Sequence, residues 1–479
     1  MELSVKCYVV DSICGSGKTS AALNMINDAP DDVHFLYITP YLSEIDRLQK
    51  YCAKKNFKAP KSRQESGKNK LENLKKLIQD GYNIVSTHAL LNRFDNEIIE
   101  ICRASNYVLL LDECADVIET YDIGPRDFET LMKYCDINKE TRQLVWKESE
   151  KDYHDSKFAE EKRLCELGSL VLYPEKEGNT ELNKNLLVWS MPCSVFEAFS
   201  GGVYLLTYMF ESQYQKYYYD YYGLKYEYLS VEGDSVENYH FVKFDPNKSY
   251  IKYDYSKLIH IVDNEKLNRI GTEDVPQRVQ YLLSKTWYDK MSESSVVMKT
   301  LKNNLTNFFV NLTGDACCYN LWTCFKDYKH LIKGRGYSGS SVYPQRVLTY
   351  VKKEKDRNSE VIEEMTFVKP EDKKYDKNGN LIGLNATCGF ASMNARATNS
   401  YRQTTNVAYP INRFMRTNVK NFFVMNNIKV DEDGWALSEM IQFLFRSALR
   451  EGQEINVYVP SVRMRKLLEQ WIKDNPLVE

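Results

Sequence analysis

The stretch Asp11–Thr19, DSICGSGKT, decides the fold of this chain. It follows a short apolar run, Val5–Val10, that predicts a strand, and it opens into a helical run, Ser20–Ile26. A glycine-rich loop between a strand and a helix places backbone N–H groups at the positive end of the helix, where phosphates bind. The stretch therefore predicts a phosphate-binding loop, although Ser12 stands where the common pattern has its first glycine.

The second half of this loop carries the residue types that hold a nucleotide. Backbone amides would wrap the phosphates, Lys18 would reach the β- and γ-phosphates, and the Thr19 hydroxyl would hold Mg²⁺. The predicted phosphate ligands are Gly15, Ser16, Gly17, Lys18 and Thr19. ATP and Mg²⁺ are the cofactors that this loop implies.

Short apolar strands alternate with amphipathic helices through the first part of the chain. The predicted strands are Val5–Val10, Phe35–Thr39, Asn83–Thr87, Tyr107–Leu111, Leu186–Ser190 and Val203–Thr207. The predicted helices are Ser20–Ile26, Ser43–Lys54, Lys68–Gln79 and Asn96–Ala104. Most of these strands are continuously apolar, which is typical of parallel strands that are buried on both faces. The alternation predicts a doubly wound α/β layer structure.

Two stretches interrupt this pattern. Residues 125–185 are rich in Lys and Glu between Asn138 and Glu166, which favours a helical insertion on the surface. The run Gln213–Tyr228, QYQKYYYDYYGLKYEY, lies where a first α/β lobe should end. Its tyrosines could stack on bases, but packing between lobes is the favoured interpretation.

The second half of the chain repeats α/β features more loosely. Its predicted strands are Leu258–Val262, Tyr319–Thr323, Phe422–Met425 and Ile455–Val459. Its predicted helices are Ser294–Val310, Ser438–Arg450 and Ser461–Ile472. We therefore expect two domains, residues 1–225 and 226–479.

An acidic motif, VLLLDECAD, supports the nucleotide interpretation. The apolar strand Tyr107–Leu111 would deliver Asp112 and Glu113 at its carboxyl end, the edge at which ligands bind open α/β sheets. Asp112 would orient Mg²⁺ and Glu113 would polarise the attacking water. Two acids in a solvated loop are the alternative.

With this motif the chain resembles the superfamily 2 helicases and translocases, which include the DEAD-box proteins; DECA at Asp112–Ala115 stands in for DEAD. YITPYLSEIDRL (Tyr37–Leu48) and VSTHALL (Val85–Leu91) resemble the two motifs that contact the nucleic-acid backbone. LLTYMFES (Leu205–Ser212) resembles the Ser-Ala-Thr motif, which couples hydrolysis to strand movement. The resemblance implies nucleic-acid contacts at Thr39, Pro40, Thr87 and His88, and a coupling role for Thr207.

The segment QFLFRSALR (Gln442–Arg450) resembles motif VI, whose arginines reach the γ-phosphate. Gln442 and Arg446 would share a face of one helix, and the resemblance implies that Arg446 is the arginine finger. Leu449 stands where the family has its second arginine, so Arg450 would act less directly. The implied catalytic residues are thus Glu113, Arg446, Gln442 and Arg450. The alternative is a surface helix that carries two cations.

Two further segments complete the resemblance. GFASMNARATNSY (Gly389–Tyr401) and LWTCFKDY (Leu321–Tyr328) match motifs V and IV, which implies nucleic-acid contacts at Arg396 and Thr323. Together with NRFMRTNV and YVPSVRMRKLL, they look most like bacteriophage-encoded DEAD-like helicases. The resemblance implies a P-loop NTPase of two tandem RecA-like domains, α/β with parallel sheets flanked by helices and a helical insertion in the first.

Composition limits how such a protein could meet nucleic acid. The formal net charge of the 479 residues is −2, so binding must use a local basic face. Nine Lys or Arg residues and only two acids lie between Lys54 and Lys76. They would give salt-dependent, largely sequence-independent affinity; a solvated helix face is an equally favoured interpretation.

No apolar run approaches the roughly 18 residues that a membrane span needs, and the N-terminus does not resemble a signal peptide. Twelve scattered cysteines fit a reducing compartment. We expect a cytoplasmic protein without a membrane partner, in the host cytoplasm if it is phage-encoded.

The predicted function is that of an ATP-dependent helicase or translocase, acting on DNA in preference to RNA, in phage replication or recombination and with proteins of those processes as candidate partners. One alternative is a translocase that moves on duplex DNA without separating its strands. Another is a nucleotide-gated module that clamps nucleic acid without productive turnover. An ATPase unrelated to nucleic acid is the third.

Overall fold

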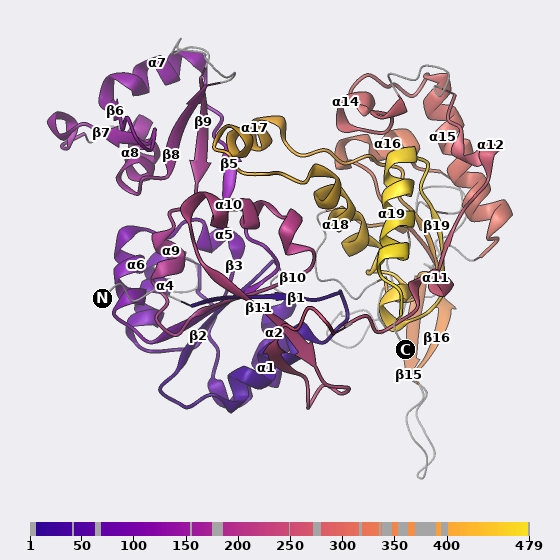
Figure 1. Cartoon of the computed structure of the whole chain (residues 1–479), viewed down its shortest axis with the longest axis horizontal. Coiled ribbons are helices and arrows are strands. Elements are labelled where there is room, and N and C mark those ends of the chain that lie inside the picture. The colour runs from indigo at the N-terminus through magenta and orange to yellow at the C-terminus, as the bar shows by residue number, and fades with distance from the viewer. Residues whose placement is uncertain are drawn as a thin grey trace. The chain divides into compact units, whose positions relative to one another are not determined.

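The computed structural model describes most of the chain and divides it into two compact units (Figure 1). The described residues are 6–40, 43–62, 69–153, 156–174, 185–248, 250–271, 279–315, 319–334, 337, 347–352, 363–368, 389–393 and 401–477. Unit 1 contains Met1–Tyr250 and Met415–Trp435, and unit 2 contains Ile251–Phe414 and Ala436–Glu479. Within the described residues, no helix is both long and apolar enough to cross a bilayer.

Unit 1 is built on a seven-stranded sheet in the order β12-β11-β1-β10-β4-β2-β3. All neighbouring pairs are parallel except β11 and β12. The strands are β1 (Cys7–Asp11), β2 (His34–Thr39), β3 (Ile84–Thr87), β4 (Tyr107–Asp112), β10 (Val203–Thr207), β11 (Tyr226–Glu232) and β12 (His240–Lys243). Five of them confirm predicted strands. The parallel α/β layer is therefore confirmed.

Short helices flank this sheet (Figure 1). They are α1 (Lys18–Asp28), α2 (Ser43–Tyr51), α4 (Lys70–Gln79), α5 (His88–Leu91), α6 (Asn96–Arg103), α9 (Ser194–Glu197) and α10 (Tyr214–Tyr222). Asn69 and Glu72 form a capping box that starts α4, and the Asp95 side chain caps α6. Ala22 and Ile26 of α1 are buried in one cluster with Val10, Tyr37 and Leu110 of the sheet. Burial of apolar side chains thus joins the helix after the phosphate loop to the strands that carry the site.

The insertion was predicted to be helical, and that prediction is wrong. Its described residues contain the strands β6 (Cys135–Ile137), β7 (Leu144–Trp146) and β8 (Leu170–Pro174) beside the helices α7 (Pro125–Tyr134) and α8 (Ala159–Glu166). The strands β5 (Ile118–Thr120) and β9 (Asn185–Ser190) flank it. A separate hydrophobic cluster that includes Leu131, Leu144 and Leu170 holds it together. The predicted strand Leu186–Ser190 exists as β9, but it pairs antiparallel with β5 and β8 instead of joining the main sheet.

Unit 2 has a five-stranded parallel sheet in the order β13-β19-β18-β14-β17. Its strands are β13 (Ile259–Ile261), β14 (Asn320–Trp322), β17 (Gly389–Phe390), β18 (Asn406–Ala408) and β19 (Ile455–Tyr458), beside an antiparallel pair, β15 (Val347–Lys352) and β16 (Glu363–Val368). Its helices are α11 (Tyr255–Leu258), α12 (Glu265–Asn268), α14 (Lys285–Tyr288), α15 (Val296–Thr306), α16 (Lys329–Ile332) and α19 (Val462–Asp474); α18 (Glu432–Leu444) begins in unit 1.

Two predicted elements of the second half are corrected. Phe422–Met425 is the end of helix α17 (Thr417–Met425), not a strand, because a short apolar run does not separate the two by periodicity. Val419, Phe422 and Phe423 are its buried face. The predicted helix Ser438–Arg450 ends at Leu444, since the Ser447 hydroxyl accepts from the Leu449 amide and starts a separate 3₁₀ turn.

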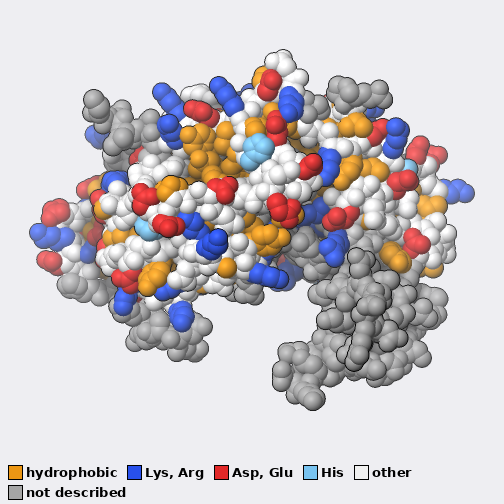
Figure 2. Space-filling view, turned by 90° about the horizontal axis from the view of Figure 1, so that it is seen from below, with side chains coloured by type: hydrophobic (Ala, Val, Ile, Leu, Met, Phe, Trp, Pro, Cys, Tyr) orange, Lys and Arg blue, Asp and Glu red, His pale blue; other side chains and the backbone are white. Residues whose placement is uncertain are grey.

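The first division between the two units, after Tyr250, lies later in the sequence than the predicted boundary at residue 225. β11 pairs with β1 and β12 pairs with β11, so a division at 225 would remove two strands from the first sheet. Met415–Trp435, far along the chain, also belongs to unit 1. Basic and acidic side chains are interspersed on the face seen in Figure 2, in line with the formal net charge of −2.

Candidate nucleotide-binding site

The loop between β1 and α1 has the backbone of a phosphate cradle. Gly15 and Gly17 have φ angles of 85° and 93°, in the left-handed region that glycine enters without strain. Helix α1 begins at Lys18, and the Ala21 amide donates to the Gly17 carbonyl at 2.9 Å. The loop therefore feeds directly into a helix N-terminus, where an anion is stabilised.

Polar side chains of this loop fit a phosphate group. The Ser16 hydroxyl is buried and has no hydrogen-bond partner among the described residues. The Lys18 ammonium lies folded across the start of the loop, where it donates to the carbonyls of Ser12 and, at 3.0 Å, Ile13. An arriving phosphate could use the hydroxyl and draw the ammonium from those carbonyls. The residues present thus fit a nucleotide.

The sheet order brings the acidic motif to the same edge as the loop. β10 lies between β1 and β4, with Asp11 opposite Thr207 and Leu206 opposite Asp112. The carboxyl ends of these parallel strands therefore meet at one edge. Asp112 is buried as the last residue of β4.

Glu113 has an unusual backbone conformation. Its φ angle is 71°, left-handed although it is not glycine, and its amide donates to the Leu206 carbonyl at 2.9 Å. Such a conformation costs about 1–3 kcal/mol and persists where the surroundings impose it, often at functional sites. The hydrogen bond to Leu206 of β10 helps to hold the backbone from which the predicted water-polarising carboxylate extends.

Neighbouring side chains tie the acidic motif to the rest of unit 1. The Cys114 Sγ lies 3.3 Å from the Thr207 hydroxyl, and the Ala115 amide donates to Gln215 Oε1 of α10 at 2.9 Å. His88 Nε2 lies 3.0 Å from the Asp112 carbonyl. Thr207 was predicted to couple hydrolysis to strand movement, and His88 was predicted to contact nucleic acid. Both residues lie beside the acidic motif.

Asp11 is a residue of this site for which the sequence predicted no role. Its two carboxylate oxygens accept from the amides of Met209 and Phe210 at 2.8 and 2.9 Å, so it fixes the turn after β10. Burial raises the pKa of this carboxyl above its usual range. An acid directly before the loop was the only signal in the sequence.

Of the residues predicted to contact nucleic acid, some lie together in unit 1 and one lies in unit 2. Thr39 and Thr87 are opposite each other at the carboxyl ends of β2 and β3, and Pro40 follows β2, half-buried. Thr323 belongs to unit 2, directly after β14, and is fully buried. Among the described residues, the hydroxyls of Thr39 and Thr323 have no hydrogen-bond partner. Arg396 lies outside the described residues.

Three lysines of the basic stretch Lys54–Lys76 contact other residues of unit 1. Lys75 pairs with Asp95 at 2.8 Å, Lys58 lies 3.2 Å from the centre of the Tyr82 ring, and Lys55 donates to the Ala29 carbonyl at 2.5 Å. These three cations stabilise the unit itself, which favours the structural interpretation for them. Residues 63–68 of the stretch lie outside the described residues.

The residues predicted for motif VI lie in unit 2 and do not share one helix. Gln442 is in α18, Arg446 is in the turn beyond its end, and Arg450 is in the following 3₁₀ turn. The Arg446 guanidinium is buried and donates to the carbonyls of Ser392 and Met393, each at 2.9 Å. The expectation that Gln442 and Arg446 share a helical face is therefore wrong.

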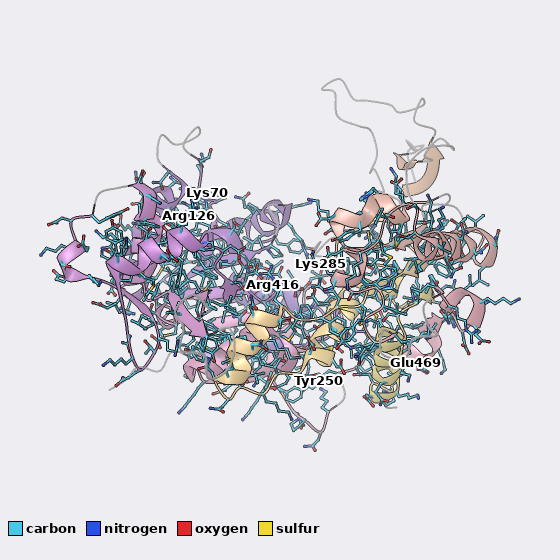
Figure 3. The ribbon with its side chains drawn as sticks, turned by 90° about the horizontal axis from the view of Figure 1, so that it is seen from above. Lys70, Arg126, Tyr250, Lys285, Arg416 and Glu469 are labelled. Atoms are coloured by element: carbon cyan, nitrogen blue, oxygen red, sulfur yellow. The ribbon has the colours of Figure 1, made fainter. Side chains whose placement is uncertain are left out.

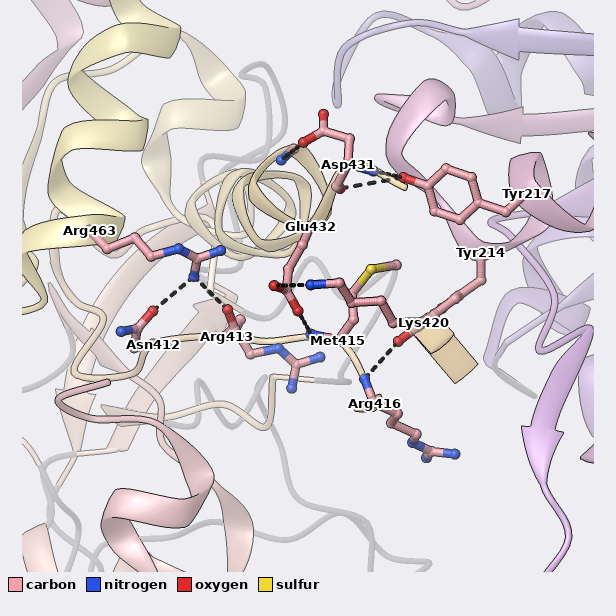
Figure 4. A network of polar contacts seen from close by, with 11 residues as sticks. Tyr214, Tyr217, Asn412, Arg413, Met415, Arg416, Lys420, Asp431, Glu432 and Arg463 are labelled. Carbon is pink, nitrogen blue, oxygen red and sulfur yellow. Dashed lines mark hydrogen bonds and ion pairs between the residues drawn. The ribbon is translucent and has the colours of Figure 1, made fainter. Parts of the chain in front are cut away.

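The tyrosine-rich run Gln213–Tyr228 forms α10 and the start of β11, and it packs inside unit 1 instead of linking two lobes. Tyr217, Tyr218 and Tyr219 are buried. Other tyrosines of α10 contact Met415–Trp435. The Tyr214 hydroxyl accepts from the Arg416 amide at 3.1 Å (Figure 4). The Tyr221 ring lies 5.0 Å from that of Phe422. The Arg416 side chain, labelled in Figure 3, pairs with Glu119 at 3.2 Å.

Asp431, in the segment Met415–Trp435, makes several hydrogen bonds to the rest of unit 1. Its amide donates to the Tyr217 hydroxyl at 2.9 Å, which itself donates to the Asp431 carbonyl at 3.3 Å (Figure 4). Its carboxylate accepts from the Ser212 hydroxyl at 3.0 Å and from the Gly434 amide at 2.9 Å. Burial raises the pKa of Tyr217 to about 12, so the hydroxyl keeps its proton at neutral pH.

Replacing Tyr217 with Phe should loosen this anchor. The Asp431 amide loses its partner, at a cost of about 1–2 kcal/mol. Its hydrogen exchange should accelerate by roughly tenfold. The control is Tyr221→Phe, because the Tyr221 ring also contacts the segment but its hydroxyl makes no hydrogen bond within the described residues. Equal exchange in the two variants would contradict the anchoring role.

Comparisons with known proteins extend over both units. Residues 253–472 match the model of the YonV C-terminal Rossmann-like domain, in agreement with the parallel α/β sheet of unit 2. The chain is 33% identical over 472 residues to the SPbeta prophage-derived uncharacterized protein YonV of Bacillus subtilis (strain 168). The match covers 97% of this chain and 98% of that protein. A prophage-derived relative fits the predicted phage origin.

Proposed function

We propose that this chain, which belongs to the YonV family, is an ATP-dependent helicase or translocase of the superfamily 2 type, built from two RecA-like domains. The observation that carries the proposal is the edge of the unit 1 sheet. There the phosphate loop follows β1, Thr207 ends β10, Asp112 ends β4, and Glu113 follows it. A phosphate cradle beside paired carboxylates suits hydrolysis of a nucleoside triphosphate.

Each residue at this edge has a distinct task in the proposed reaction. Lys18 leaves the carbonyls of Ser12 and Ile13 and binds the β- and γ-phosphates, together with the loop amides. Thr19 and Asp112 would hold Mg²⁺, which neutralises charge on the phosphates. Glu113 accepts a hydrogen bond from the attacking water and orients it toward the γ-phosphate. Thr207 contacts Cys114 of the acidic motif and directly precedes the turn that Asp11 holds. A shift of the acidic motif during hydrolysis would therefore move this turn.

Replacing Glu113 with Gln should separate binding from turnover. ATP binding is retained because the loop is untouched, whereas hydrolysis falls by about 100-fold because an amide is a poor proton acceptor. Calorimetric titration and phosphate release measure the two quantities. The matched control is Asp116→Asn, an exposed acid three residues away. Unchanged turnover in Glu113→Gln would remove Glu113 from the mechanism.

The nucleic-acid half of the proposal rests on the motif-like segments at the ends of β2 and β3. Thr39 and Thr87 lie side by side on the edge that carries the nucleotide site, which would couple a strand to hydrolysis. DNA is the proposed partner. Strand displacement on a fork, beside triplex displacement on a duplex, separates a helicase from a translocase that leaves the strands paired.

A nucleotide-gated binding module is the second candidate. The Arg446 guanidinium is held by the carbonyls of Ser392 and Met393, and a guanidinium kept there would not assist turnover. This candidate predicts nucleic-acid affinity that changes with bound nucleotide, together with ATP hydrolysis that no DNA or RNA stimulates.

A further inference from the structure

The ring of Tyr239 lies against the phosphate loop. A Cβ atom added to Gly17 would come within 2.5, 2.7 and 2.7 Å of Cδ1, Cε1 and Cγ of that ring. The ring thus covers the residue directly before Lys18. Tyr239 ends the turn between β11 and β12 and is partly exposed. An aromatic ring beside a phosphate site can stack on a nucleobase.

The turn that carries Tyr239 is fixed to the helix of the phosphate loop. Asn24 of α1 donates through Nδ2 to the carbonyls of Val236 and Tyr239, each at 2.9 Å. Within the turn, Asn238 Oδ1 accepts from the amides of Asp234 and Ser235 at 2.9 Å. The backbone that carries the ring is therefore preorganised, which reduces the entropy lost when a ligand binds.

A cavity of about 670 Å³ opens beside Tyr239, between α1 and β12. Its aromatic floor is formed by Tyr8, Tyr204 and Phe241: the first two rings lie 4.8 Å apart at 29°, and the second and third 6.0 Å apart at 18°. Asn24 and Asp28 of α1 add polar groups to one wall. An aromatic cavity of this size with a few polar groups suits a nucleoside.

The sheet order determines which end of a nucleotide faces this cavity. Asp112 and Glu113 lie at the carboxyl end of β4, on one side of β1, and Tyr239 precedes β12, on the other side. A triphosphate whose γ-phosphate faces the acids therefore leaves its nucleoside on the side of β11 and β12.

We propose that the cavity beside Tyr239 binds the base and ribose of the nucleoside triphosphate, with the Tyr239 ring stacked on the base. The proposal rests on the nucleotide site proposed above. It adds a recognition element that does not touch the phosphates.

The test compares two ligands that differ only in the nucleoside. ATP and inorganic tripolyphosphate, each with Mg²⁺, are titrated into the full chain and into Tyr239→Ala. ATP affinity should fall by about 10- to 100-fold, the loss of one stacked base, while tripolyphosphate affinity should change by less than about 3-fold. Tyr239→Phe keeps the ring and should bind ATP like the wild type. Tyr51→Ala, which removes an exposed tyrosine of unit 1, is the matched control.

The outcomes separate this proposal from the nucleotide site itself. Equal losses for both ligands would mean that Tyr239 only supports the loop, and no loss for ATP would mean that the base lies elsewhere; either result overturns the proposal. If the wild type bound neither ligand, or if Lys18→Ala bound ATP normally, the proposed nucleotide site at the phosphate loop would be refuted as well.

A second measurement does not depend on the folding of a variant. An azidoadenine analogue of ATP, photolysed in the wild type with Mg²⁺, should label the peptide that contains Tyr239, and excess ATP should suppress the label. A suppressible label on another peptide overturns the proposal. This measurement also decides the matter if tripolyphosphate binds too weakly to titrate.

Discussion

Replacing Lys18 with Ala should lower ATP hydrolysis by about 10³-fold or more and weaken ATP binding. The Lys18 ammonium is the only cation of the loop Asp11–Thr19, and charge on the transferred phosphoryl group is stabilised chiefly by such preorganised cations. In the structure this ammonium is already at the loop, bonded to the carbonyls of Ser12 and Ile13. Phosphate release at saturating ATP and calorimetric titration measure the two losses.

The control for this variant must separate a missing charge from a disturbed loop. Lys18→Ala removes two hydrogen bonds to loop carbonyls, so its thermal unfolding is compared with that of the wild type. Lys50→Ala, which removes an exposed lysine of α2, should change neither stability nor hydrolysis. A Lys18→Ala variant that hydrolysed ATP at the wild-type rate would refute the mechanism.

Replacing Arg446 with Ala should leave ATP binding near normal and lower hydrolysis by about 10³-fold, the effect of losing an arginine finger. The structure adds a second expectation. Because the guanidinium donates to the carbonyls of Ser392 and Met393 from a buried position, its removal should also lower the free energy of unfolding of unit 2.

Arg463 provides a matched control for Arg446. It also lies in unit 2 and donates to backbone, here to the Arg413 carbonyl at 2.6 Å, but it belongs to none of the predicted catalytic motifs. Arg463→Ala should lower stability without a specific loss of turnover. If both variants lost turnover only in proportion to their loss of folded protein, Arg446 would be a structural residue.

The parts of the site that were predicted from the sequence depend on neighbouring residues. Gly15 and Gly17 fix the loop backbone, and an apolar run directly before Asp112 makes β4. Both are local patterns, in which the side chain and the backbone conformation it requires lie in one short segment. These patterns were enough to place the loop and the acids at the ends of parallel strands.

The parts that were missed depend on distant partners. Asp11 accepts from Met209, 198 residues away, and nothing local to Asp11 indicates that contact. The Tyr217 hydroxyl accepts a hydrogen bond from the Asp431 amide, 214 residues away. Without that partner, the run Gln213–Tyr228 resembled a linker. In the insertion, Ile118 of β5 pairs with Ser190 of β9, a partner far along the chain. The Lys- and Glu-rich run Asn138–Glu166, which suggested surface helices, contains the strand β7 as well as the helix α8. Short apolar runs such as Phe422–Met425 remain ambiguous without their packing partners.

The most direct test of the central claim is the rate of ATP hydrolysis by the full chain, measured in parallel without nucleic acid and with single-stranded DNA, duplex DNA and RNA. The account predicts Mg²⁺-dependent hydrolysis that rises at least severalfold with DNA, more than with RNA, and that is absent in Lys18→Ala. Hydrolysis that none of the three nucleic acids stimulates would contradict a nucleic-acid motor, and the absence of hydrolysis under every condition would contradict the ATPase itself.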